Sequence, residues 1–111
     1  MGHVTRGNVF EDLGFSREEA IDLAMKVDLG LELRKFIDRQ NLKPHEKAAE
    51  FFNRPRPKIT NIVNNKLDGI SIEYLVRMLA KTGGRFTYNF RQPSRQTVKK
   101  RVKEQQNQAA A

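Results

Sequence analysis

The amino-acid sequence predicts an all-α fold with one short β-strand near its carboxyl end. Apolar residues recur with helical spacing through most of residues 16–83. Proline and glycine occur mostly between these periodic stretches, where they mark turns. Strict alternation of apolar and polar residues is confined to residues 85–91. At 111 residues the chain is expected to form one domain with a small core.

The longest predicted helix begins after Ser16 and ends near Gln40. Ser16 and Glu19 form a capping box, in which the hydroxyl and the carboxylate each accept a hydrogen bond from a free backbone amide. The apolar spacing continues past Gly30, although this glycine could interrupt the helix. A final helix is predicted after a capping Ser71, with glycine ending it at residue 83.

Two shorter helices are predicted between these, joined by a basic, proline-rich connection. Pro44 suits the first turn of one helix. That helix should end near Asn53, a residue that tolerates left-handed geometry. Pro55 and Pro57 cannot lie inside a helix but can begin one, so the second short helix should cover about residues 56–65. Two helices joined in this way indicate a helix-turn-helix, whose second helix reads DNA.

Polar and basic side chains of the second short helix are the candidates for contact with DNA. Ile59 and Ile62 are expected to face the core, so the polar and basic side chains of the helix are expected to face outward or lie at its flanks. Arginine can bond both acceptors of guanine, and asparagine can pair with adenine. The alternative is a solvated helix whose amides only form turns. The predicted base contacts are Arg56, Lys58, Thr60, Asn61 and Asn64, and the predicted phosphate contacts are Lys43, Arg54, Asn65 and Lys66.

The segment after the last helix is predicted to mediate dimerisation. Phe86, Tyr88 and Phe90 alternate with polar residues, and a lone strand needs a partner for its backbone groups. A symmetry copy would supply that partner and give a homodimer. The alternative is an extended segment that packs its aromatic rings on its own subunit.

The two ends of the chain are predicted to lie outside the domain of residues 9–91. Residues 1–8 are expected to be flexible. Residues 92–111 are basic and are expected to be disordered, although they could instead fold as a helix against an acidic partner or add phosphate contacts.

Charge and composition favour nucleic acid as the partner. The net charge is +8, and it is uneven: residues 1–53 carry 8 Lys/Arg against 10 Asp/Glu, whereas residues 54–103 carry 13 against 2. There is no cysteine, and His3 and His45 have no neighbours at metal-ligand spacing. We therefore expect no enzymatic activity, no metal and no cofactor. No apolar run approaches the roughly 20 residues of a membrane span, which favours a cytoplasmic protein.

Residues 9–91 resemble small bacterial and phage regulators with an XRE-type, lambda-repressor-like domain, and are most similar to HigA-like antitoxins. The matching features are the alanine pair Ala48-Ala49, the helix start Pro57-Lys58-Ile59-Thr60 and the closing Leu79-Ala80-Lys81-Thr82-Gly83. Lys43-Pro44 replaces the family's usual Thr-Gln. The resemblance implies a dimer that binds palindromic operators and represses its own promoter, and in many members an antitoxin that neutralises a RelE-like ribonuclease.

The sequence thus predicts a sequence-specific transcriptional regulator, which acts either as an antitoxin or as a stand-alone or phage regulator. In the antitoxin case the acidic residues 8–33 would face a basic toxin. Two other interpretations remain open: an adaptor that has lost DNA binding, and a non-specific nucleic-acid-binding protein driven by its basic tail.

Overall fold

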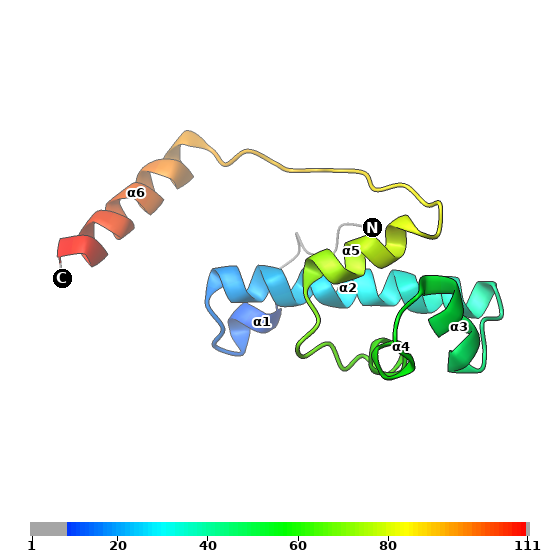
Figure 1. Ribbon diagram of the computed structural model, residues 1–111. Helices are drawn as coiled ribbons and strands as arrows, with labels where there is room; N and C mark the ends of the chain where they lie inside the picture. The colour runs from blue at the N-terminus through cyan, green and yellow to red at the C-terminus, as the bar shows by residue number, and fades with distance from the viewer. Residues whose placement is uncertain (1–8, 111) are drawn as a thin grey trace.

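The computed structural model describes residues 9–110, and within them the protein consists of helices and connecting segments (Figure 1). The expected flexible segment 1–8, with His3, lies outside the described residues. The molecule extends over 53 × 27 × 20 Å. None of the described helices is long and apolar enough to cross a membrane. The helices are α1 (Val9–Asp12), α2 (Arg17–Arg39), α3 (His45–Phe52), α4 (Arg56–Val63), α5 (Ile72–Ala80) and α6 (Arg95–Ala110).

Helix α2 packs against α1, α4 and α5, and its predicted start is confirmed. The backbone amide of Glu19 donates to the Ser16 hydroxyl over 3.2 Å, and the amide of Ser16 donates to the Glu19 carboxylate over 3.1 Å. The helix continues through the buried Gly30. A Cβ atom at this position would lie 3.3 Å from a Leu67 methyl group, so glycine permits close approach of the α4–α5 connection.

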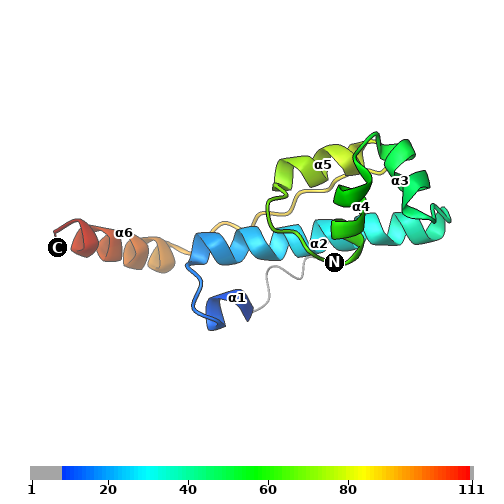
Figure 2. The same cartoon turned by 60° about the horizontal axis from the view of Figure 1, so that its bottom comes forward.

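The core lies where α2, α4 and α5 meet, with α3 packed on α4 (Figure 2). Phe52 fills its centre, with its ring centroid 5.8 Å from that of Phe36 and 4.9 Å from that of Phe51. Burying a large apolar side chain of this kind contributes about 1.5–3 kcal/mol. The largest fully buried side chains are Leu33, Ile37, Phe52, Ile59, Ile62, Ile70, Leu75 and Met78.

The predicted boundaries of the two short helices are confirmed to within a residue or two. Asn53 adopts φ 53°, the left-handed conformation expected after α3. Pro44 precedes α3 as its N-cap residue, one position before the predicted first turn. The Ser71 hydroxyl accepts a hydrogen bond from the amide of Tyr74 over 3.0 Å, as expected for the cap of α5. Gly83 has φ +83° and follows this helix.

The predicted strand near residues 85–91 is not formed, and this expectation is wrong for the single chain. The segment is extended, but no strand occurs in the described part of the protein. The physical reason is that its backbone has no second strand to pair with. Tyr88 and Phe90 are 92% and 80% exposed, so the alternative in which the aromatic rings pack on their own subunit does not describe these two side chains.

The basic tail contains α6, because residues 95–110 form a helix, which is one of the alternatives that the sequence left open for this segment. The Ser94 hydroxyl accepts a hydrogen bond from the amide of Thr97 over 3.1 Å and so caps the helix. The helix contains no glycine or proline and is rich in Lys, Arg, Gln and Ala, which have high helix propensity. These local signals were present in the sequence. They compete with a low content of apolar residues, which is typical of disordered segments.

Candidate nucleic-acid interface

The turn between α3 and α4 fixes the angle at which α4 is presented. After Asn53, the amide of Arg54 donates to the carbonyl of Ala49 over 3.0 Å and closes α3. Pro55 is the N-cap of α4 and Pro57 lies in its first turn, where a missing amide costs nothing. The result is a three-residue turn, 53–55, between two eight-residue helices. Such a unit can place its second helix in a DNA groove.

Helix α4 has a buried side and a polar outer side. Ile59 and Ile62 are fully buried, as predicted. At about 100° per residue, Asn61 and Asn64 lie on the opposite side of the helix from Ile59. Asn64 is exposed and Asn61 is partly exposed. Amides at these two positions are able to donate to and accept from base edges.

The first turn of α3 makes two side-chain contacts with α4. The Nδ1 atom of His45 lies 2.8 Å from the hydroxyl of Thr60. One residue further on, the carboxylate of Glu46 lies 3.2 Å from the guanidinium Nε of Arg56. Two of the predicted base contacts, Arg56 and Thr60, are therefore held by α3 in the structure. The sequence did not reveal His45 and Glu46 as parts of the site, because both contacts depend on the angle between the helices.

Arg54 is part of the protein's own framework. Its guanidinium carbon lies 4.9 Å from the centroid of the Tyr74 ring on α5. The same group donates to the carbonyls of Asn53, over 3.1 Å, and Phe52, over 3.5 Å. Arg54 thereby connects the helix-turn-helix turn to α5, a role that the predicted phosphate contact did not include.

Tyr74 lies beneath this corner of the site. Burial raises the pKa of its hydroxyl, and the positive charge of Arg54 acts in the opposite direction. The ammonium group of Lys58 lies 5.9 Å from the centre of the same ring. The structure therefore gathers Arg54 and Lys58 on one aromatic ring. The sequence had placed Tyr74 only on a helix.

The turn after α4 carries two more of the predicted phosphate contacts, Asn65 and Lys66. Asn65 has φ 57°, and the amide of Lys66 donates to the carbonyl of Asn61 over 2.7 Å. Both residues are exposed. Arg34 of α2 donates to the carbonyl of Ile62 over 3.3 Å and so anchors the end of α4, a role that no sequence pattern indicates. Lys43 lies at the other end of the unit, 3.3 Å from the carboxylate of Asp38, and is exposed.

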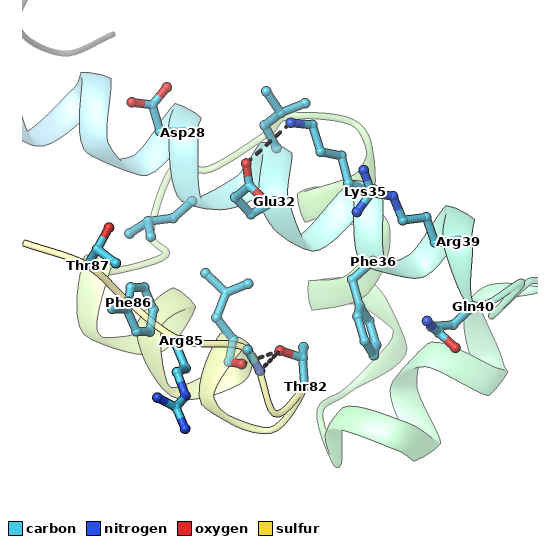
Figure 3. A pocket seen from close by; sticks show the side chains of 14 residues that line it. Asp28, Glu32, Lys35, Phe36, Arg39, Gln40, Thr82, Arg85, Phe86 and Thr87 are labelled. Carbon is cyan, nitrogen blue, oxygen red and sulfur yellow. Dashed lines mark hydrogen bonds and ion pairs between the residues drawn. The ribbon is translucent and has the colours of Figure 1, made fainter. Parts of the chain in front are cut away.

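A separate groove runs between α2 and residues 82–87 (Figure 3). Phe36 and Phe86 form part of its lining, with Glu32, Lys35 and Arg85 at its edges. It contains no cluster of metal ligands, and none occurs elsewhere among the described residues.

A family model described as a helix-turn-helix domain matches residues 9–89. No curated protein and no solved structure matches the chain. The matched region contains α1 to α5 and stops before α6. The family match, the buried face of α4 and the contacts between α3 and α4 agree on one description: the chain belongs to the helix-turn-helix domain family.

Proposed function

We propose that this protein is a dimeric, sequence-specific DNA-binding repressor that inserts α4 into the major groove of a palindromic operator. One observation carries the proposal most strongly: α4 buries Ile59 and Ile62 completely and leaves Asn61 and Asn64 on its outer side. A helix used only for packing has no need of amides on an outward face beside basic residues. A recognition helix requires that arrangement.

The predicted DNA contacts differ in whether their side chains already bond to other residues of the protein. Lys58, Asn61 and Asn64 are proposed to contact base edges, with Thr60 and Arg56 joining them when their contacts with α3 rearrange. Asn65 and Lys66 are proposed to contact phosphates beside α4, and Lys43 beside α3. Arg54 is proposed to orient α4 through Tyr74, with its charge adding to the local positive potential.

The proposed dimer uses the exposed aromatic side chains of the extended segment. Phe86 borders the groove beside α2, whereas Tyr88 and Phe90 extend into solvent (Figure 3 shows Phe86). Exposed aromatic rings next to a partly apolar groove are typical of an association surface. Two copies of α4 related by a twofold axis would then contact two half-sites.

Selection of bound duplexes from a random DNA library tests the proposal. We expect a palindromic consensus whose half-site centres are about 10 bp apart, or a multiple of that spacing. Asn61→Ala should weaken binding by about 1–3 kcal/mol and relax one base position in each half-site. Gln105→Ala, which removes an exposed amide from α6, is the matched control and should leave the consensus unchanged. A selection that enriches no sequence would contradict the proposal and favour the adaptor or the non-specific interpretation.

We further propose that the operator lies in the protein's own promoter, as the resemblance to XRE-type regulators implies. A RelE-like toxin is the additional partner that this resemblance suggests for residues 8–33. The support within the structure is the acidic, partly apolar surface of α1 and the start of α2, where Leu13 and Phe15 are exposed. Co-expression with the adjacent gene product should give a stable complex, and failure to copurify would remove the antitoxin role.

A further inference from the structure

The described side chains of α6, those of residues 95–106, are all exposed. The helix lies at the end of the extended segment 84–94, beyond the amino-terminal end of α2 (Figures 1 and 2). Val98 and Val102, one turn apart, remain 44% and 47% exposed. An isolated helix of about 12–15 residues is marginal in water, and tertiary packing supplies most helical stability in proteins. A 16-residue helix with these properties is therefore expected to pack against a further surface.

The charge of α6 restricts what that surface can be. Residues 95–106 contain five Lys or Arg and one Glu. Pairing α6 with α6 of a second copy would bring two positive helices together, which like-charge repulsion disfavours. Among residues 9–106 no ion pair joins α6 to α1 or α2, and the ion pair within α6 joins Arg101 to Glu104. A surface of opposite charge is the better match.

Such a surface exists at the opposite end of the same sequence. Residues 9–22 contain five Asp or Glu and one Arg, the reverse of the balance in α6. Large apolar side chains are exposed among these acids, notably Val9, Leu13 and Phe15. We call residues 9–22 the acidic end. It offers carboxylates for the lysines of α6 and an apolar area for its two valines, so the two surfaces are complementary in charge and in hydrophobicity.

We propose that α6 of one copy docks on the acidic end of a second copy, so that two chains exchange their carboxyl-terminal helices. In the described chain, α6 faces its own acidic end across a groove lined by Glu18 on α2 and by Thr97 and Arg101 on α6. No ion pair between the described residues joins the two surfaces, so the carboxylates remain open to α6 of a second copy. The segment 84–94 can span up to about 36 Å when extended, at about 3.3 Å per residue. That reach is sufficient for α6 to cross to a neighbouring copy.

The exchange builds on the proposed dimer, because the connecting segment is the one that exposes Tyr88 and Phe90. If two chains associate through these rings, each α6 begins beside the interface and can extend away from the other helices of its own chain. The apolar rings would then hold the two copies together, and the positive charge of each α6 would direct it to the acidic end of the other copy. A basic toxin bound at the acidic end would compete with the arm for the same carboxylates.

Charge reversal distinguishes exchange from every other arrangement of α6. The arm variant changes α6 and is Lys99→Glu/Lys100→Glu. The body variant changes the acidic end and is Asp12→Lys/Glu18→Lys. A matched control, Lys47→Glu/Lys81→Glu, makes the same charge change as the arm variant at exposed positions outside both surfaces. Sedimentation velocity without DNA measures the dissociation constant of the dimer, and far-UV circular dichroism confirms that each variant is folded.

We expect the arm variant and the body variant each to dissociate at least tenfold more readily than the unmodified protein, and the control to resemble it. Mixing the two variants should restore the dimer as a heterodimer, because each arm then meets a body of opposite charge. A mixture that stays monomeric would overturn the exchange and leave docking within one chain. An arm variant that dimerises normally but loses affinity for scrambled duplex would also overturn it, and would assign α6 to nucleic acid. The base preference conferred by Asn61 is measured separately with the unmodified arm and body, so it tests the proposed function independently of either result.

Discussion

The ion pair between Glu46 and Arg56 gives a specific prediction about DNA binding. The two side chains are 58% and 61% exposed and 3.2 Å apart, so the pair contributes at most about 1 kcal/mol to stability. Arg56 has to leave Glu46 before it can bond a base or a phosphate. In Glu46→Gln this competing contact is weakened, and the free energy that the pair contributed no longer opposes binding.

The expected effect of Glu46→Gln is an increase in operator affinity of up to about fivefold, the factor that corresponds to about 1 kcal/mol. Thermal unfolding should shift only slightly, because the pair lies at the surface. Fluorescence anisotropy at fixed salt measures the affinity, and the salt series shows whether the gain shrinks as the pair is screened.

A double-mutant cycle with Arg56→Gln separates release of Arg56 from the mere loss of a negative charge near DNA. If the ion pair is the cause, Glu46→Gln should have little effect once Arg56 is replaced. An equal gain in both backgrounds would refute the reasoning, since it would show that the carboxylate acts on the DNA directly.

Three further predictions concern stability. Ile62→Ala should lower the free energy of unfolding by about 2–5 kcal/mol in denaturant titration, because it opens a cavity among fully buried residues; a loss below 1 kcal/mol would contradict the described core. Burial raises the pKa of Tyr74, so the stability that its neutral hydroxyl contributes is constant below pH 10 and is lost as the pH rises through the higher pKa of the folded state. Tyr74→Phe should therefore reduce the loss of stability at alkaline pH. An unchanged profile of unfolding free energy against pH would contradict this prediction. Backbone and side-chain hydrogen bonds from Ser16 lower the pKa of Glu19, so the stability that its carboxylate contributes is present above pH 4.5 and is lost as the pH falls through the lower pKa of the folded state. Glu19→Gln should therefore lose less stability on acidification. An identical profile of unfolding free energy against acidic pH would argue against the capping box.

The features that the sequence predicted correctly are those with local causes. The cap at Ser16, the left-handed Asn53 and the cap at Ser71 each depend on residues within a few positions of one another. The burial of Ile59 and Ile62 follows from helical spacing alone. These signals were sufficient to place the two short helices of the motif.

The features that escaped sequence reasoning depend on contacts between elements. The pairing of His45 with Thr60 and the position of Arg54 over Tyr74 follow from angles between helices, which no local pattern encodes. The strand near residues 85–91 was wrongly expected because alternation marks an extended segment, whereas a strand also needs a partner backbone. Helix α6 had a local signal in Ser94 and Thr97, but its apolar spacing was too sparse to outweigh its polar composition.

Anisotropy of the unmodified protein on its own upstream DNA and on scrambled duplex, across a salt series, tests the central claim most directly. We expect a preference of about a thousandfold for the upstream DNA, together with a moderate salt slope. Asn61→Ala should reduce that preference by about 1–3 kcal/mol while leaving binding to scrambled duplex unchanged. Equal and steeply salt-dependent binding to both duplexes would contradict sequence-specific recognition by α4.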